Sequence, residues 1–118
     1  MLIKTLKSKI HRATVTDAHI DYPGSIGIDS QLLEASGLVP YEVVLVADVT
    51  NGSRLETYVV PEEAGSGKVV ILGAAAQLMK QGDIIIIMGF GLFSPDEAKT
   101  FKPKVVVADE KNGIKGMM

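Results

Sequence analysis

The chain has 118 residues, a length that suits one domain with its own hydrophobic core. Its formal charge is −2 and its 12 basic residues are scattered, so a nucleic-acid partner is not expected. The absence of cysteine excludes disulfides, thiol nucleophiles and thiolate metal ligands.

Apolar residues make up 47% of the chain, which is more than one small subunit readily buries. This composition favours a homo-oligomer. The longest apolar run, residues 84–93, is too short to span a membrane as a helix, and the N-terminus has no signal-peptide core. We therefore expect no membrane partner and a cytoplasmic location.

Most of the predicted elements are short strands. Runs of β-branched residues, several with apolar side chains at alternate positions, predict them. In chain order they span residues 2–6, 9–16, 26–29, 43–49, 55–60, 68–72, 84–88 and 104–108. The run at 84–88 has no polar alternation, so it is predicted to be buried on both faces.

Short turns and helices separate these strands. A helix is predicted over 31–36, with Asp29 or Ser30 as its N-cap and Gly37 ending it. Asn51-Gly52 predicts a hairpin, because both residues tolerate positive φ. The remaining predictions, in chain order, are a helix over 73–79, a helical turn beginning at Pro95 and a loose tail over 112–118.

Many short strands with two or three very short helices indicate a mainly β fold, in the form of a small closed barrel covering residues 1–118 as a single domain. The lack of longer helices argues against a parallel α/β sheet. Closure also removes free sheet edges, which protects a chain carrying four consecutive isoleucines from aggregation.

The pair Gly24-Ser25 is the first candidate for chemistry. After Pro23 it predicts an ordinary tight turn, since proline presets φ and glycine accepts positive φ. It is also a peptide bond that the Ser25 hydroxyl could attack at the Gly24 carbonyl, if a strained backbone allowed it. The resulting oxyanion would need a donor, such as a threonine hydroxyl or a backbone N–H.

The remaining polar residues have simpler explanations when composition alone is considered. Cross-strand packing accounts for Thr57, and a half-buried ring accounts for Tyr58. His11 and His19 lie apart on extended chain without acidic partners at ligand spacing, so no metal is expected. A Ser-His-Asp triad lacks its nucleophile elbow, because no glycine stands two residues before Ser25.

Several segments taken together resemble a known family. These segments are Lys9–Thr16, Tyr22-x-Gly24-Ser25, Val49–Arg54, Thr57-Tyr58, Gly73–Ala76 and Gly82–Ile85. In this order and at these spacings the chain resembles the pyruvoyl-dependent aspartate 1-decarboxylases over nearly its whole length. The resemblance implies a double-psi β-barrel that assembles as a homotetramer, with active sites between subunits.

The activity that the resemblance implies is decarboxylation of L-aspartate to β-alanine and CO₂, which feeds pantothenate and coenzyme A synthesis. Self-cleavage between Gly24 and Ser25 would produce chains 1–24 and 25–118. Ser25 would become a pyruvoyl group, the cofactor, which forms a Schiff base with the substrate and serves as the electron sink that decarboxylation requires. No metal is implied, and a maturation factor is a possible further partner.

The resemblance also implies roles for individual residues. Tyr58 would protonate the carbanion, and a tyrosine hydroxyl carries its proton at neutral pH as a donor must. Thr57 would also assist self-cleavage. Arg54 and Lys9 are candidates for holding a substrate carboxylate, Arg54 as a planar bidentate clamp. The residues implied to contact substrate are Thr57, Gly73, Ala74 and Ala75.

The chain departs from the family pattern at Leu72, where an asparagine is typical. An amide that could hydrogen-bond the carbonyl at the cleavage site is therefore missing, which disfavours efficient self-cleavage. Two other functions stay open. Ser25 could be the free N-terminal nucleophile of an amidohydrolase. Alternatively, the chain could be a non-catalytic or poorly processed double-psi barrel that acts in binding or assembly.

Overall fold

Nine strands and three short helices make up the computed structural model, which describes all of residues 1–118. The strands are β1 (Ile3–Thr14), β2 (Asp17–His19), β3 (Ser25–Asp29), β4 (Val43–Asp48), β5 (Arg54–Glu62), β6 (Val69–Leu72), β7 (Ile84–Phe93), β8 (Lys104–Ala108) and β9 (Ile114–Met117). The helices are α1 (Ser30–Ser36), the 3₁₀ helix η1 (Gly73–Gln77) and α2 (Pro95–Thr100). The prediction of a mainly β fold with two or three short helices is confirmed.

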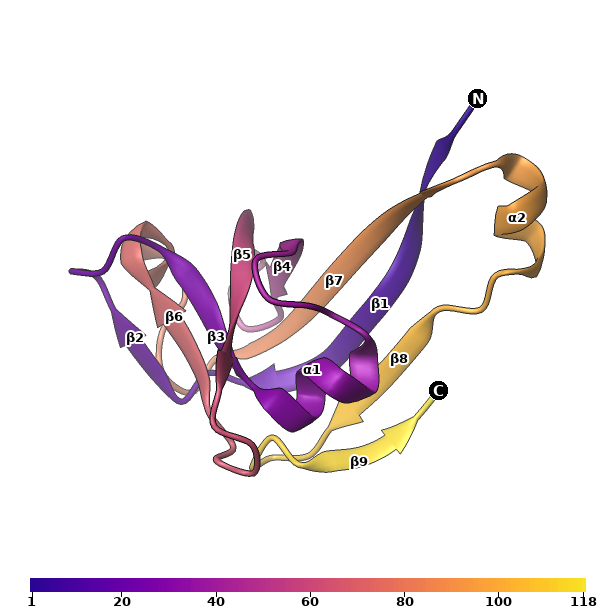
Figure 1. Cartoon of the computed structure of the whole chain (residues 1–118). Coiled ribbons are helices and arrows are strands. Elements are labelled where there is room, and N and C mark those ends of the chain that lie inside the picture. Colours follow the sequence, from indigo (N-terminus) through magenta and orange to yellow (C-terminus); the bar gives the residue numbers. More distant parts are fainter.

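The strands form one curved sheet in the order β2-β6-β3-β5-β4-β7-β1-β8-β9. Only Val15 and Thr16 separate β1 from β2, so one continuous stretch of chain pairs with β7 and β8 at one end and with β6 at the other. Between these pairings, the Thr16 N–H donates to the Val69 carbonyl at 2.8 Å. The sheet therefore curls back on itself through this stretch (Figure 1), as expected for a small double-psi barrel.

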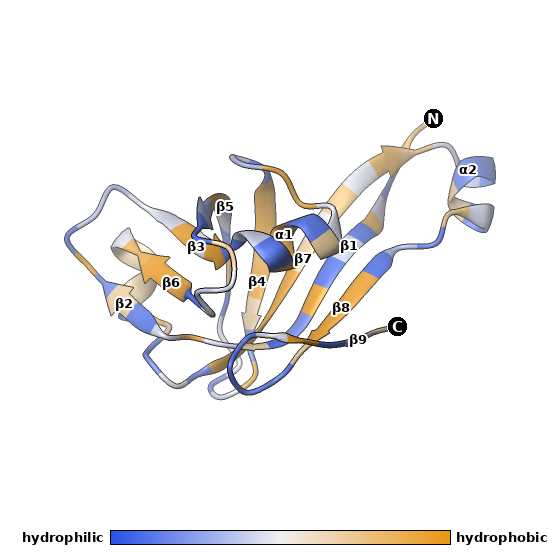
Figure 2. Cartoon of the chain, turned by 60° about the horizontal axis from the view of Figure 1, so that its bottom comes forward, coloured by the Kyte–Doolittle hydropathy of each residue, from blue (hydrophilic) through white to orange (hydrophobic).

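The core lies on the inward face of this curved sheet, with Leu32 and Leu33 of α1 packed onto it. Figure 2 shows apolar residues concentrated in the strands, whereas α2 is polar. Along β7, Ile85 and Ile87 are fully buried, but Ile84, Ile86 and Met88 on the other face are only partly buried. The prediction that 84–88 is buried on both faces is therefore wrong for the single chain, because nothing covers the outward face of this one-layered sheet.

An arm projects from the barrel. It consists of the N-terminal half of β1 paired with the C-terminal half of β7, followed by α2 (Figure 1), and it lengthens the molecule to 42 × 27 × 25 Å. The predicted helical turn beginning at Pro95 is confirmed as α2. Ser94 and Glu97 form a reciprocal capping box at its start, in which each side chain accepts the other's backbone N–H.

The N-terminal segment differs from the prediction of two separate strands. Residues 3–14 form one strand, β1, whose register against β7 shifts between Leu6 and Ser8 and again between Ile10 and Ala13. Arg12 lies in the second shift with φ 63°. These irregularities bend the strand, which lets it pair with β7 over the arm and with β8 over the barrel.

The C-terminal tail also differs from the prediction, because it is not loose. Asn112 is buried, and its side-chain oxygen accepts from the Thr14 N–H at 2.8 Å. Its amide donates to the carbonyls of Thr14 at 2.8 Å and Gly67 at 2.9 Å. This side chain holds the tail against the barrel, so that residues 114–117 pair with β8 as β9.

The predicted hairpin around Asn51-Gly52 is confirmed, although its turn is longer than two residues. Only Gly52 has a positive φ, at 80°. The turn is organised by Asp48 at the end of β4, whose Oδ1 accepts from the N–H groups of Thr50 at 2.8 Å and Asn51 at 3.2 Å. Hydrogen bonds to the buried Asp48 side chain thus stabilise this longer turn in place of a two-residue turn.

The other oxygen of Asp48 faces a second buried carboxyl group, that of Asp83. Oδ2 of Asp48 is fully buried and has no donor within the chain, while Oδ2 of Asp83 accepts from the Lys80 N–H at 3.0 Å. Burial first, and then the hydrogen bond to Asp83, raise the pKa of Asp48 above its ordinary value of 3.8. When Asp48 is protonated, its buried Oδ2 can therefore donate to the Asp83 carboxyl group.

The Asp48–Asp83 pair makes stability depend on pH. Because the pKa of Asp48 is raised by folding, its contribution to the unfolding free energy is complete below 3.8 and is lost as pH rises through the folded value. Asparagine would supply an N–H donor that does not titrate. We expect Asp48→Asn to raise the unfolding free energy by about 1 to 2 kcal/mol at about pH 7, and by less at about pH 4.

Urea unfolding of both proteins at the two pH values measures this difference. The exposed Asp96 provides the matched control, because Asp96→Asn removes a surface carboxylate whose pairing with Lys99 contributes little. An equal gain for Asp48→Asn at both pH values would contradict the raised pKa of Asp48.

Candidate active site

The peptide between Gly24 and Ser25 is strained. Gly24 ends the loop after β2 with φ 130°, and Ser25 opens β3 with φ 122°, a region that residues with a side chain rarely occupy. Such a conformation costs on the order of 1–3 kcal/mol and persists only where its surroundings enforce it. Ser25 is 4% exposed and pairs with Leu72, while the next residue pairs with Val59 of β5. The strands on both sides thus hold the strained peptide in place.

A tyrosine hydroxyl lies at the carbonyl of this peptide. Oη of Tyr58, on β5, donates to the Gly24 carbonyl oxygen at 3.4 Å. Nucleophilic addition to that carbonyl would place negative charge on the same oxygen, where a donor stabilises it. The arrangement therefore suits acyl transfer from Gly24 to a neighbouring hydroxyl.

The backbone of η1 approaches the strained peptide closely at Gly73. Gly73 has φ 84°, and a Cβ atom placed on it would lie 2.7 Å from the Gly24 Cα and 2.8 Å from the Tyr22 carbonyl oxygen. All the nearest atoms are backbone atoms, which cannot rotate away. Only glycine therefore fits at position 73.

A cavity of about 300 Å³ opens beside Gly24, between β5 and η1. Thr57 contributes a hydroxyl to its wall, whereas the Leu72 side chain contributes an apolar surface where an amide was expected from the family pattern. Its lining residues are Pro23, Gly24, Leu55, Glu56, Thr57, Leu72, Ala74, Ala75 and Leu78.

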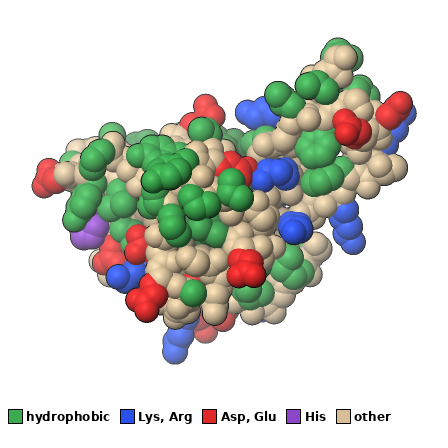
Figure 3. All heavy atoms as spheres, viewed as in Figure 1, with side chains coloured by type: hydrophobic (Ala, Val, Ile, Leu, Met, Phe, Trp, Pro, Cys, Tyr) green, Lys and Arg blue, Asp and Glu red, His purple; other side chains and the backbone are tan.

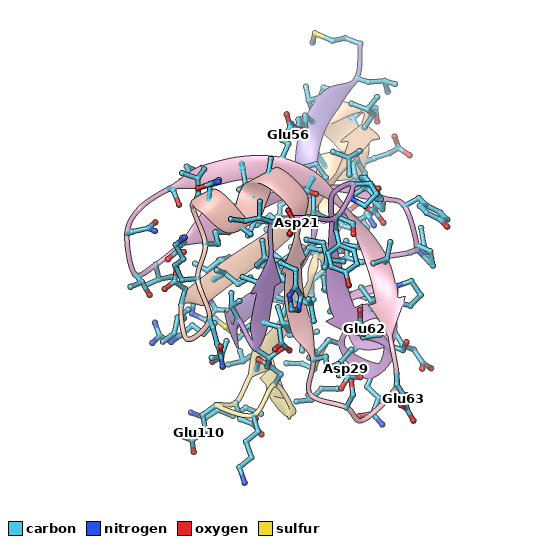
Figure 4. The ribbon with its side chains drawn as sticks, turned by 90° about the vertical axis from the view of Figure 1, so that its left-hand side faces the viewer. Asp21, Asp29, Glu56, Glu62, Glu63 and Glu110 are labelled. Atoms are coloured by element: carbon cyan, nitrogen blue, oxygen red, sulfur yellow. The ribbon has the colours of Figure 1, made fainter.

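Sequence reasoning missed three of these lining residues. Leu55 alternates with Thr57 along β5, a signal that could have placed both on one face. Leu78 follows η1, and no pattern in the sequence indicated that it would line a cavity. Glu56 is the only charged residue in the lining; in Figure 4 it lies near the upper end of the molecule, away from Asp29 at the lower end.

Arg54 and Lys9 do not line this cavity, and neither do Ser25, Tyr58 and Gly73, which instead lie directly beside Gly24. Arg54 begins β5 and is exposed, with Ala47 as its partner on β4. Lys9 pairs with Met88 of β7, and three strand spacings, roughly 14 Å, separate β1 from β5. The structure therefore brings Gly24, Ser25, Thr57, Tyr58 and the 73–75 segment together, but not Lys9 or Arg54.

Lys9 and Arg54 nevertheless share one face of the sheet with Tyr58. Directly opposed residues of antiparallel strands point to the same side, and the registers connect Glu56 through Leu45 and Met88 to Lys9. Arg54 and Tyr58 flank Glu56 on β5 at the two-residue period of a strand. All three candidates thus occupy the outward face of the barrel.

No group of three or more His, Asp or Glu side chains is arranged to hold a metal ion. None of the helices has the length and apolar character needed to cross a membrane.

Fold and site together define a small β-barrel protein organised around a strained glycine–serine peptide. The family described as aspartate decarboxylase matches residues 1–115. Aspartate 1-decarboxylase of Thermosipho africanus is 61% identical over 109 residues, which cover 92% of this chain and 89% of that protein. The enzyme of Acetivibrio thermocellus is 56% identical over 114 residues, covering 97% and 90%, and that of Listeria monocytogenes is 52% identical over 109 residues, covering 92% and 86%. The chain belongs to the aspartate decarboxylase family, so the resemblance seen in the sequence is confirmed.

The contact at Gly73 predicts a severe effect of the smallest side chain. Gly73→Ala combines a positive φ with overlap against backbone, and we expect it to lower the unfolding free energy by at least about 2 kcal/mol. Gly116→Ala is the matched control, because a Cβ atom there meets nothing within 4 Å. Thermal unfolding of both variants measures the effect. Equal Tm values for the two would show that the Gly73–Gly24 approach is not a constraint.

Proposed function

We propose that this protein decarboxylates L-aspartate to β-alanine and CO₂, after cutting its own chain between Gly24 and Ser25. The observation that carries the proposal is the strained Gly24–Ser25 peptide, whose carbonyl oxygen accepts from Tyr58 at 3.4 Å. The names of its relatives support the substrate and the reaction. β-Alanine would then serve pantothenate and coenzyme A synthesis.

Self-cleavage would begin with addition of the Ser25 Oγ to the Gly24 carbonyl carbon. The C–N bond breaks, the serine nitrogen takes up the hydroxyl proton, and the amide becomes an ester. β-Elimination then releases Gly24 as a carboxylate, and water displaces ammonia from the new terminus to leave a pyruvoyl group. Strain at the positive φ of Ser25 raises the energy of the starting peptide, and the Tyr58 hydroxyl would stabilise the oxyanion.

The pyruvoyl group would supply an electron sink for the carbanion that forms when CO₂ leaves. The Tyr58 hydroxyl, which lies at the Gly24 carbonyl, would donate a proton to the substrate carbon. Thr57, Ala74 and Ala75 line the cavity, where their small side chains leave room for substrate. Apolar walls would also limit the access of water.

A cation for the substrate carboxylates would come from the outward face of the sheet. Glu56, the one charged residue in the lining, cannot bind a carboxylate, so binding needs Arg54, Lys9 or both. We propose that the protein is a homotetramer in which a second copy covers this face and supplies Lys9. Exposed apolar side chains support a covered face, among them Val43 at 59% and Leu92 at 70%.

Figure 3 shows such apolar side chains gathered at two places on one side of the molecule, over the part of the barrel where β3, β4 and β5 lie and along the projecting arm. A hollow separates the two places. A shape of this kind suits the interlocking of identical subunits.

The intact mass of the purified protein tests the proposal. We expect two chains, residues 1–24 and 25–118, with the larger one lighter by one ammonia than a chain that starts with serine. A larger chain that starts with serine would support an amidohydrolase instead. A single uncut chain after prolonged warming, with no CO₂ released from aspartate, would support a non-catalytic barrel.

Ser25→Ala should remain uncut and produce no β-alanine, because it lacks the hydroxyl that attacks Gly24. Ser66→Ala, in an exposed loop, should be cut and active like the natural protein. Production of β-alanine by a pure Ser25→Ala preparation would refute the assignment.

Tyr58→Phe separates cleavage from turnover. Loss of one hydrogen bond worth about 1 kcal/mol should slow cleavage about fivefold without preventing it. Decarboxylation by the fully cleaved variant should fall about 100-fold or more, since general acids contribute roughly 10² to 10⁴. Mass spectrometry follows the cleavage and CO₂ release follows the turnover. Normal turnover would mean that another group donates the proton.

A further inference from the structure

Tyr41 has a backbone conformation that its side chain disfavours. Its φ is 70°, in the left-handed region, which residues other than glycine, asparagine and aspartate rarely adopt. Burial does not explain the conformation, because Tyr41 is 75% exposed. No motif in the sequence predicted a role for it.

The surrounding contacts fix this conformation firmly. The Tyr41 N–H donates to the Val59 carbonyl at 2.7 Å, and the Val59 N–H donates to the Glu42 carbonyl at 3.0 Å. The Glu42 carboxylate pairs with Lys7 at 2.8 Å, and it accepts from the Val39 N–H at 3.2 Å. The turn before β4 is thus tied to β1, to β5 and to itself.

The result of this arrangement is a ring placed beside Tyr58. The centroids of the Tyr41 and Tyr58 rings are 6.2 Å apart and their planes are inclined by 34°, within the range in which aromatic rings attract one another. Tyr58 also contacts the Gly24 carbonyl through its hydroxyl. The Tyr58 side chain therefore contacts both the Tyr41 ring and the strained peptide.

We propose that Tyr41 is a positioning residue for Tyr58. It restricts the Tyr58 ring to the orientation in which the hydroxyl contacts the Gly24 carbonyl, and the strain at Tyr41 is the cost of holding that neighbour in place. The proposal rests on the proposed function of Tyr58 as the proton donor. It assigns to Tyr41 no contact with substrate.

Two substitutions separate the ring from the backbone strain. Tyr41→Asn removes the ring and introduces a residue that tolerates positive φ, so the fold should be unharmed or more stable. Tyr41→Phe keeps the ring and removes only the hydroxyl. We expect both variants to cleave fully, and Tyr41→Asn to have a Tm no lower than that of the natural protein.

In decarboxylation we expect Tyr41→Asn to lower kcat about 5- to 10-fold while KM stays within about twofold, because a misplaced proton donor affects the transition state more than binding. The solvent deuterium isotope effect on kcat should rise in this variant, since proton delivery becomes slower. Tyr41→Phe should keep kcat within about twofold of the natural value. An unchanged kcat in Tyr41→Asn, or an equal loss in Tyr41→Phe, would overturn the proposal.

A second readout does not depend on activity. The chain has three tyrosines, so fluorotyrosine labelling gives a ¹⁹F spectrum in which single substitutions assign the Tyr58 signal. In uncut Ser25→Ala protein, adding Tyr41→Asn should narrow the Tyr58 signal and move it towards that of the free amino acid. An unchanged signal would refute the positioning role even if aspartate were not the substrate. Absence of CO₂ release from the natural protein would instead refute the proposed function.

Discussion

The approach of Gly73 to Gly24 is the contact on which the rest of the site depends. With no side chain at position 73, the start of η1 reaches the backbone of the loop before β3, and Leu72 can pair with Ser25. That pairing, with β5 on the other side of β3, holds Ser25 at a φ it would otherwise leave. The strained peptide thus lies between the η1 backbone and β5, which brings the Tyr58 hydroxyl to its carbonyl.

The inward and outward faces of the barrel have different roles. The inward face packs the core and carries Thr57 into the cavity wall, whereas the outward face carries Tyr58 and the two cations proposed for the substrate. A single chain leaves that outward face apolar and uncovered, with Lys9 far from its own Gly24. Assembly of identical subunits would resolve both problems at once, because covering the apolar face also brings cations from one copy towards the cavity of another.

Some features of this chain follow from no family motif. Leu72 presents an apolar wall to the cleavage site, so the donors left for the Gly24 oxyanion are the hydroxyls of β5. Burial and the neighbouring Asp83 raise the pKa of Asp48 beneath the turn that leads into the same strand. The Tyr41 ring lies beside the Tyr58 ring, and the Tyr41 backbone has a strained, positive φ. Each of them lies beside β5, which bears the reactive tyrosine, or at the turn that leads into this strand.

The sequence by itself determined the features that depend on residues close together in the chain. Alternating β-branched residues specified most of the strands, Asp29 and Gly37 specified the ends of α1, and ordered short motifs specified the family. Only the tertiary structure decided the features that join distant segments. Asn112 holds the tail as a strand through bonds to Thr14 and Gly67, and the positive φ of Ser25 depends on β5 and β6. Lys9 lies away from the cavity because strand order, which no local pattern encodes, puts two strands between β1 and β5.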